Sequence, residues 1–206
     1  MNKLIKVCGM RQAENIRAVE ALGIDMMGFI FYPKSPRFVQ ELPAYMPTSA
    51  QRVGVFVNET EQAIMACAEQ YGLNYVQLHG QESPDFCKTL QAQGMKVMKA
   101  LSIGRSKDLD NGLAYEGVCD YLLFDTLCEQ HGGSGKQFDW ELLNQYRGST
   151  PFLLSGGIDA GSVRALRAIR HEQLAGFDIN SRFEQQPGLK DMESIKAFLN
   201  DLQRKK

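Results

Sequence analysis

The chain has 206 residues, with 23 Lys and Arg against 24 Asp and Glu, and its formal net charge is −1. This near-neutral balance gives no broad basic surface, so we expect neither a nucleic acid nor an acidic membrane as partner. The apolar stretches are shorter than the ~18 residues of a membrane span, and the apolar run at the start is too short for a signal peptide. A soluble protein with a small-molecule partner is expected.

Five cysteines lie along the chain, an odd number without a C-x-x-C pair, and most of them sit inside apolar stretches. The pattern is typical of free thiols in a reducing compartment and not of a disulfide framework. The three histidines lack the spacing of metal ligands. We therefore expect a cytoplasmic protein without a bound metal. The residues concerned are Cys8, Cys67, Cys87, Cys119, Cys128, His79, His131 and His171.

Short apolar and β-branched runs recur along the chain and predict eight strands. Between several of them, apolar residues follow the i, i+3, i+4, i+7 spacing of a helix, most clearly from Ile64 to Tyr71 and from Ile195 to Leu202. Strands that alternate with helices pair in parallel. The predicted strands are Leu4–Cys8, Met26–Phe31, Arg52–Val57, Tyr75–Leu78, Lys96–Leu101, Tyr121–Phe124, Phe152–Ser155 and Gly176–Ile179.

Two connections are poor helices. Pro43 and Pro47 interrupt the one after the second strand, and three glycines with scattered charges lie in residues 102–117, after the fifth strand. We expect shortened or irregular helices there. Eight repeats in a chain of this length favour a single (β/α)₈ barrel over residues 1–206. An open doubly wound sheet, which is built from the same repeats, is the alternative.

Polar residues follow the predicted strands, at the face where barrels carry their chemistry. The two-residue period of a strand places Lys6 on the same face as Cys8. A cation below the sulfur would favour the thiolate, which could then act as a base although a free thiol titrates near ~8.5. The alternative is that Cys8 is only a small buried apolar residue.

Asp125 ends the sixth strand, behind the apolar run Tyr121–Phe124. Burial there would raise the pKa of its carboxyl, as a general acid requires. A thiolate base and a carboxylic acid on different strands would form an acid–base pair. The alternative is that Asp125 only caps the turn that follows.

The last quarter of the chain carries the pattern of a phosphate site. Ser155-Gly156-Gly157 follows the seventh strand and leads through Asp159 into a helical segment, so backbone N–H groups can approach an anion closely. Asn180 and Ser181 follow the eighth strand. Loops after these two strands often build a phosphate site together, although S-G-G is also a common tight turn.

Two other loops are candidates for the site. Arg37 follows a proline-stiffened stretch after the second strand and could bind a substrate carboxylate with its fork, or lie in solvent. Residues 131–136 have the glycine density of a mobile lid. They lack the G-x-x-x-x-G-K-[ST] order of a P-loop, and no G-x-G-x-x-G follows the first strand, so ATP and dinucleotides are not expected.

Several short motifs follow one another from the first strand to the last. In chain order they are K-V-C-G-M, G-F-I-F-Y-P-K-S-P-R, V-G-V-F, V-Q-L-H-G, L-F-D-T, G-G-S-G-K-x-F-D-W, L-S-G-G and F-D-I-N-S. Together they cover essentially the whole chain. In their order and spacing, the chain resembles the phosphoribosylanthranilate isomerase family of tryptophan biosynthesis.

The resemblance implies an Amadori rearrangement of a phosphorylated aminosugar by a monomer or homodimer. The reaction leaves the redox state of the substrate unchanged, so no cofactor is expected. By resemblance, Cys8 is the general base, Asp125 the general acid, and Arg37 binds the anthranilate carboxylate. The remaining implied residues are Gly156, Gly157, Asn180 and Ser181 at the phosphate, with Asp178 and His79 at the ribose or in an ordering role.

The chain departs from the common family pattern after the eighth strand, where N-S-R-F-E carries a cation and a ring in place of glycine and an aliphatic residue. Arg182 either adds a phosphate contact or points to solvent. Two other functions stay open at this point. One is another cofactor-free phosphosugar isomerase or lyase that uses Cys8 and Asp125, and the other is a phosphosugar-binding protein without catalysis.

Overall fold

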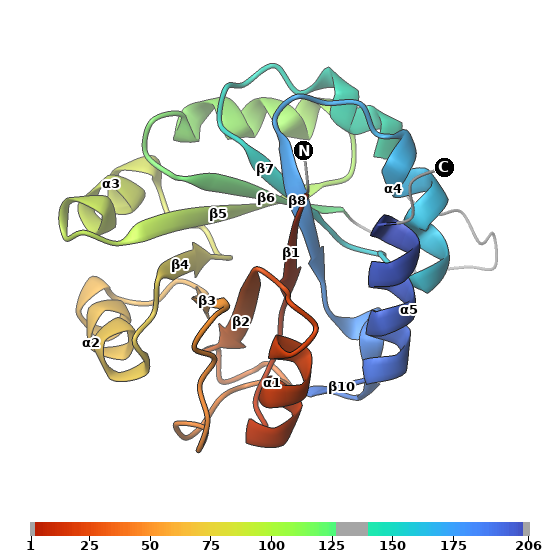
Figure 1. Cartoon of the computed structure of the whole chain (residues 1–206). Helices are drawn as coiled ribbons and strands as arrows, with labels where there is room; N and C mark the ends of the chain where they lie inside the picture. The colour runs from red at the N-terminus through yellow and green to blue at the C-terminus, as the bar shows by residue number, and fades with distance from the viewer. Residues whose placement is uncertain (1–2, 127–139, 204–206) are drawn as a thin grey trace.

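Eight parallel strands close into a barrel in the order β1 to β8, with β8 paired back to β1 (Figure 1). The structure is a computed structural model and describes residues 3–126 and 140–203. The closed ring confirms the predicted barrel, so the open doubly wound alternative is wrong. The strands are β1 Leu4–Val7, β2 Met26–Ile30, β3 Gln51–Phe56, β4 Tyr75–Leu78, β5 Lys96–Ile103, β6 Tyr121–Thr126, β7 Phe152–Ser155 and β8 Leu174–Ile179.

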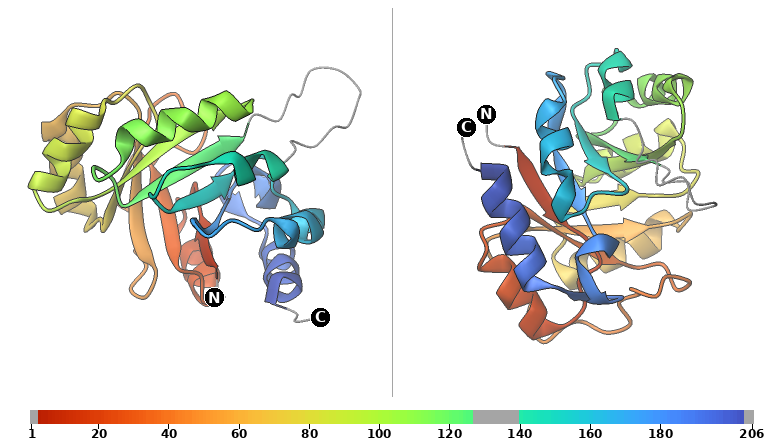
Figure 2. Two further views of the ribbon diagram at one scale, coloured as in Figure 1. Left: turned by 90° about the horizontal axis from the view of Figure 1, so that it is seen from above. Right: turned by 90° about the vertical axis from the view of Figure 1, so that its right-hand side faces the viewer.

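Helices lie outside the strands, and Figure 2 shows β8 beside β1 within this ring. The α-helices are α1 Ala13–Glu20, α2 Glu61–Tyr71, α3 Pro84–Ala92, α4 Val163–Ala168 and α5 Met192–Gln203. Short 3₁₀ helices are η1 Ser106–Tyr115, η2 Trp140–Gln145, η3 Ala160–Ser162 and η4 Ser181–Phe183, and a small hairpin joins β9 Glu184–Gln186 to β10 Leu189–Lys190. Among the described residues, no helix has the length and apolarity to cross a bilayer.

Local chemistry sets the ends of helix α2. The Thr60 side chain accepts a hydrogen bond from the Ala63 N–H at 3.3 Å, as a helix N-cap does. Gly72 ends the helix with φ of 57°, a left-handed conformation that glycine adopts without strain. The buried face of the helix includes Ile64 and Ala68, which are one turn apart.

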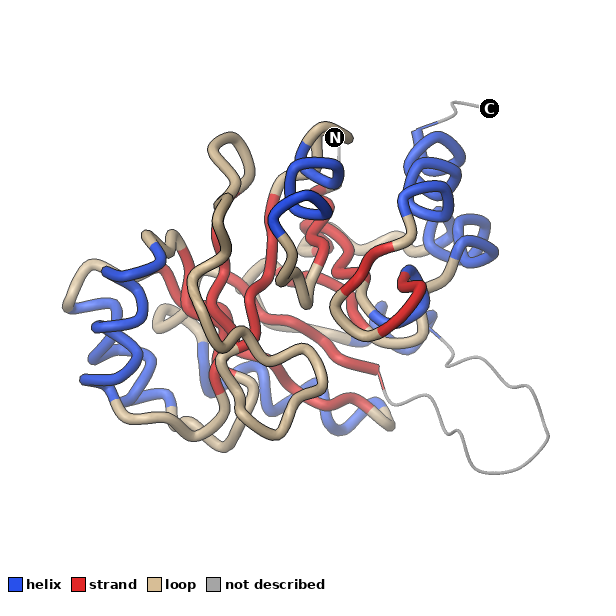
Figure 3. The backbone as a smooth tube through the Cα atoms, turned by 90° about the horizontal axis from the view of Figure 1, so that it is seen from below, coloured by secondary structure: helices blue, strands red, loops and turns tan. Residues whose placement is uncertain are grey.

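Both connections predicted to be irregular are irregular. Residues 31–50, between β2 and β3, are all described and contain no helix, and Figure 3 draws this segment as loop. A 3₁₀ helix, η1, takes the place of an α-helix after β5. Prolines and glycines disfavour a helix through local backbone effects, so the sequence alone was sufficient to predict these two irregular connections.

The core has two parts that the barrel wall separates. The larger part packs the outer faces of the strands against the helices. The smaller part lies inside the ring and comprises Met26, Val53, Tyr75, Met98, Ala100, Leu123 and Leu153. Towards the carboxyl ends of the strands this interior becomes polar, with buried Lys6, Gln77 and Asp178. The apolar layer thus closes one end of the barrel, and the polar layer forms the floor of a pocket at the other.

Candidate active site

A pocket of about 230 Å³ opens at the carboxyl ends of the strands. Every residue that the sequence assigned to catalysis or substrate binding lines it, although these residues come from six parts of the chain. The lining comprises Cys8, Ile30, Arg37, Val55, Gln77, His79, Asp125, Ser155, Gly156, Gly157, Ile158, Asp178, Asn180, Ser181 and Arg182. The glycine-rich segment 131–136, predicted to be a lid, lies outside the described residues.

Cys8 follows directly after β1 and is held against the last strand. Its backbone N–H donates to the carbonyl oxygen of Ile179 at 2.9 Å. The side chain is buried, and Gly28 on β2 leaves the space for it, because a Cβ at Gly28 would lie 2.5 Å from the Cys8 sulfur. The role of Gly28 was not predicted, although a glycine inside a strand often marks such a close approach.

The cation predicted below the sulfur is present. Lys6 is buried, donates a hydrogen bond to the Asp178 carboxylate at 2.8 Å, and interacts with Cys8. Its effect on the thiol is smaller than expected. Burial raises the pKa of the Cys8 thiol above its ordinary value, and Lys6 opposes this shift without cancelling it, while the Asp178 carboxylate adds to it. The resting protein therefore holds a neutral thiol, where the sequence had favoured a thiolate.

Asp125 differs from its predicted environment. Its side chain is 34% exposed, so the expected burial behind Tyr121–Phe124 is wrong. It is the next-to-last residue of β6 and lines the pocket. The imidazole Nε2 of His79 lies 3.4 Å from its Oδ2, and the His79 side chain is 35% exposed. The carboxyl and the imidazole thus lie side by side at the pocket wall.

Gln77 is a site residue that sequence reasoning missed. Its Nε2 lies 3.2 Å from His79 Nδ1, which orders the imidazole that faces Asp125. The buried Gln77 Oε1 and Asp178 Oδ1 have no hydrogen-bond partner among the described residues, and both side chains line the pocket. Such buried acceptors are normally satisfied, so they suit hydroxyl or amine donors of a ligand. A polar residue two positions before His79 in an apolar strand was the available signal.

The turn after β7 has the conformation that an anion cradle requires. Gly156 and Gly157 have φ of 89° and 68°, values that a larger residue would adopt only with strain. The chain then enters η3 and α4, as predicted, and η4 begins at Ser181. Arg182 is exposed at the rim of the pocket. Backbone turns from β7 and β8 therefore meet on one side of the pocket, where an anionic group can bind.

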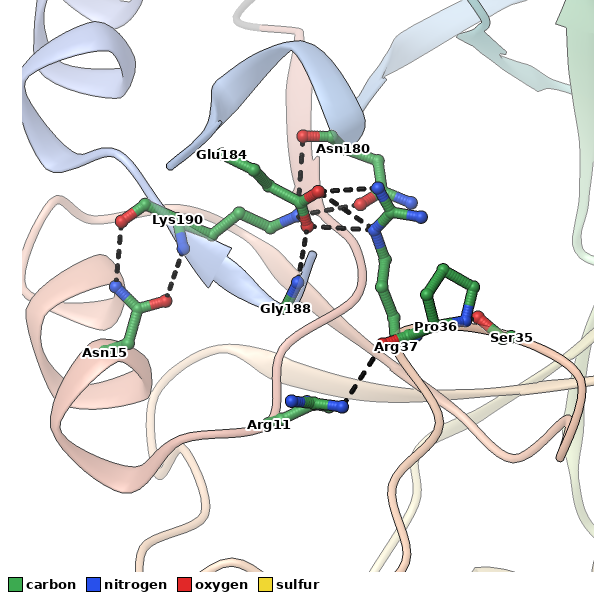
Figure 4. A network of polar contacts seen from close by, with 9 residues as sticks. All are labelled: Arg11, Asn15, Ser35, Pro36, Arg37, Asn180, Glu184, Gly188 and Lys190. Atoms are coloured by element: carbon green, nitrogen blue, oxygen red, sulfur yellow. Dashed lines mark hydrogen bonds and ion pairs between the residues drawn. The ribbon is translucent and has the colours of Figure 1, made fainter. Parts of the chain in front are cut away.

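Arg37 reaches the pocket, but Glu184 holds one edge of its guanidinium. Nε donates to Glu184 Oε1 at 2.9 Å, and Nη2 donates to Oε2 at 2.6 Å (Figure 4). The Nη1 group makes no hydrogen bond within the described residues. Arg37 is therefore neither solvated surface nor a free fork, and a ligand carboxylate would meet the edge that Glu184 leaves open. In the described part of the chain, no group of three or more His, Cys, Asp or Glu is placed to hold a metal ion.

A closed (β/α)₈ barrel with a thiol, a carboxyl and an imidazole around one pocket at its mouth defines the chain as a barrel enzyme. A family model described as N-(5'phosphoribosyl)anthranilate (PRA) isomerase matches residues 5–201. The chain belongs to this family, which confirms the resemblance seen in its motifs.

Relatives agree over nearly the whole length. The chain is 52% identical over 202 residues to the N-(5'-phosphoribosyl)anthranilate isomerase of Phocaeicola vulgatus, covering 98% of each chain. The crystal structure of phosphoribosyl anthranilate isomerase from Thermotoga maritima has a TM-score of 0.82 at 34% identity, with 98% of each chain covered. Another, a complex with reduced 1-(o-carboxyphenylamino)-1-deoxyribulose 5-phosphate, has a TM-score of 0.80 at 32% identity, again covering 98% of each.

Proposed function

We propose that this chain isomerises N-(5'-phosphoribosyl)anthranilate to 1-(o-carboxyphenylamino)-1-deoxyribulose 5-phosphate in tryptophan biosynthesis, as a monomer or homodimer in the cytoplasm. Family membership supports the reaction. The single structural observation that carries the proposal is the convergence of Cys8 and Asp125 on one pocket, beside the glycine turn after β7. The Amadori rearrangement needs an acid, a base and an anchor for a phosphate, and each has a candidate there.

Asp125 acts first, as general acid. It donates its proton to the furanose ring oxygen, which opens the ring and leaves an iminium on the anthranilate nitrogen. Its partly exposed side chain lines the pocket, so the carboxyl is accessible to the substrate. His79, ordered by Gln77, holds the carboxyl in place.

Cys8 then acts as general base and removes the proton from C2′, giving an enolamine that tautomerises to the ketone. The thiol is neutral at rest because it is buried, so the thiolate must form within the occupied pocket. The iminium is a positive charge created there by ring opening, and together with Lys6 it favours the thiolate. The electron pair of the C2′–H bond moves to the iminium, and the redox state of the substrate is conserved without a cofactor.

The other residues bind the two charged ends of the substrate. The phosphate is held by Gly156, Gly157, Asn180 and Ser181. The glycine turn after β7 and the start of η4 both lie on the same side of the pocket, where these residues can bind it. Arg37 holds the anthranilate carboxylate through the edge that Glu184 leaves open. Asp178 supplies a buried acceptor for a ribose hydroxyl through Oδ1.

A fluorescence-depletion assay with freshly made phosphoribosylanthranilate and no added cofactor tests the proposal. With wild-type protein the fluorescence of the substrate should fall as it is converted. Cys8→Ser and Asp125→Asn should each lower kcat by ~10²–10⁴-fold, the usual effect of removing a general base or acid. Cys67→Ser is the matched control, because that half-buried thiol lies on α2 away from the pocket. Its activity should be unchanged.

The outcomes separate the alternative functions. Near wild-type rates in either site variant would refute the assigned acid–base pair. A wild-type protein that binds the product analogue without turnover would be a phosphosugar-binding barrel. Turnover of other phosphosugars, with none of phosphoribosylanthranilate, would point to a different isomerase or lyase.

A further inference from the structure

A buried ion pair lies behind the pocket, outside the set of groups that donate or accept the transferred protons. Lys190, on β10, donates to Glu184 Oε1 at 2.6 Å, and the two side chains are 0% and 3% exposed. Removing both charges from water is costly, so such a pair persists only where further hydrogen bonds satisfy it. The partners that do so include two residues of the pocket, Arg37 and Asn180.

Glu184 fixes the guanidinium of Arg37. Besides Lys190, it accepts hydrogen bonds from Nε and Nη2 of Arg37 and from the backbone N–H of Gly188 at 3.1 Å. Because a guanidinium is planar, one that is held along its Nε–Nη2 edge cannot rotate without breaking its hydrogen bonds to the carboxylate. The remaining edge, with Nη1, is thereby kept in one orientation beside the pocket.

Lys190 fixes the side-chain amide of Asn180. Its Nζ donates to Asn180 Oδ1 at 2.7 Å, and Figure 4 shows this ammonium between Glu184 and Asn180. An ammonium has only donors, so the oxygen of the amide must face it. The NH₂ group of Asn180 is therefore turned away from Lys190, and its two donors are available for an anion in the pocket.

The pair is itself held in a fixed place. The backbone of Lys190 exchanges two hydrogen bonds with the Asn15 side chain on α1, at 2.8 and 3.1 Å. Arg11 donates to the carbonyl oxygen of Pro36 at 3.2 Å, which ties the loop that carries Arg37 to the same region. Gly9 completes the packing, because a Cβ there would lie 2.6 Å from Arg37 Cδ and 2.8 Å from Asn180 Oδ1. Arg37 and Asn180 are thus oriented before any ligand arrives.

We propose that Glu184 and Lys190 are positioning residues, a buried pair that presents Arg37 to the carboxylate and Asn180 to the phosphate of one substrate. The inference rests on the proposed function, because it assigns the two anionic ends to these side chains. A single pair thereby sets both ends of the binding site at once, and it acts on substrate binding more than on the chemical step.

Steady-state kinetics of Glu184→Gln is the first test. The amide cannot satisfy both Arg37 and Lys190 as the carboxylate does, so KM should rise at least ~10-fold while kcat changes less than ~3-fold. A change of this kind marks lost binding energy and not lost transition-state stabilisation. Glu184→Asp keeps the charge but withdraws it from Arg37, and should raise KM to a smaller extent. Unchanged KM in both variants would overturn the proposal.

A double variant separates positioning from mere structural support. The double variant Glu184→Gln with Lys190→Met removes both charges of the pair, so neither is left buried without its partner. The midpoint of urea unfolding should therefore return towards that of wild type. KM should stay high, and the inhibition constant of inorganic phosphate should rise, because the Asn180 amide is free to rotate. Recovery of KM together with stability would show that the pair only supports the fold.

The control is Glu116→Gln, which removes a carboxylate that accepts hydrogen bonds from the backbone N–H and the hydroxyl of Ser149, outside the pocket lining. It should lower stability and leave KM and phosphate inhibition unchanged. If destabilisation alone raised KM in this variant, the positioning role would be refuted. Absence of turnover by wild-type protein would instead refute the proposed function, so the two failures are distinguishable.

Discussion

The Cys8 thiol lies among charges of both signs. Lys6 and Lys190 lower its pKa, the Asp178 carboxylate raises it, and burial raises it more than any of these. The net result is a raised pKa in the resting protein. Substrate binding and ring opening must therefore supply part of the driving force for deprotonation, which would restrict the base to an occupied pocket.

A pH titration of Cys8 follows from these directions. The thiolate fraction grows as pH rises, so a raised pKa moves the midpoint of iodoacetamide alkylation above the ordinary thiol value of ~8.5. Lys6→Met removes a nearby cation and should move the midpoint higher, whereas Asp178→Asn removes an anion and should move it lower. Subtracting the rates of Cys8→Ser isolates this one cysteine. A wild-type midpoint below the ordinary value would contradict the shift.

Individual side chains were predicted unevenly. The two-residue strand period was sufficient to place Lys6 near Cys8, because that relation is local. Burial and the Asp178 carboxylate, which together raise the pKa of Cys8, depend on the folded arrangement of distant parts of the chain. Lys6 and Asp178, for example, are 172 positions apart in sequence. Glu184 and Lys190 were missed for the same reason, since charged residues in a polar stretch carry no sign that the fold will bury them.

The connection between β2 and β3 is a loop in place of a helix, and the Glu20 carboxylate holds this loop. Glu20, at the end of α1, accepts hydrogen bonds from the backbone N–H groups of Thr48 and Ser49, both at 2.6 Å, and from the Tyr45 hydroxyl. Burial alone would raise its pKa, but these bonds lower the pKa to about 2. The connection therefore depends on a charged side chain where neighbouring connections depend on helix packing.

Glu20→Gln should lower stability in a pH-dependent way. The folded pKa of Glu20 is depressed, so its contribution is present above the ordinary value of 4.5 and is lost as pH falls towards about 2. At neutral pH we expect a loss of about 1 kcal/mol, because solvent screens a carboxylate this close to the surface. Urea unfolding at pH 7 and pH 3 measures it. A difference between variant and wild type that grew on acidification would contradict this account.

Elements were predicted better than side chains. All eight strands lie within a few residues of their predicted positions, since apolar runs and the turn residues between them are local signals. The missing helix followed from two prolines, but the Glu20 contacts that replace it join residues about 30 positions apart and left no pattern in the sequence.

At the scale of the molecule, closing the barrel also assembles the site. The register of β1 on β8 pairs Leu4 with Gly176 and Lys6 with Asp178, so the contact that closes the ring also forms the ion pair beneath Cys8. A closed ring was predicted from eight repeats in a short chain, but this register was not, because it joins the two ends of the sequence. The assignment of residues 1–206 to one domain stays a prediction.

Gly176→Ala tests this coupling of closure and site. A Cβ at Gly176 would overlap the carbonyl oxygen of Leu4, a backbone atom that moves only if β1 shifts. We expect a loss of about 1–3 kcal/mol in the free energy of unfolding, typical of overpacking in a core. A shift of β1 also displaces Lys6 from Asp178, so kcat should fall in the molecules that remain folded.

Gly161→Ala is the matched control for the same substitution. A Cβ there meets only Asp159 Oδ1, at an ordinary 3.4 Å, and the glycine does not have positive φ. Its free energy of unfolding should stay within about 0.5 kcal/mol of wild type, and its activity should be retained. Urea unfolding and the fluorescence assay, carried out on both variants, decide the question. If Gly176→Ala lost stability but kept full kcat, closure of the ring and alignment of Lys6 beneath the thiol would be independent, and the shared register would have no catalytic consequence.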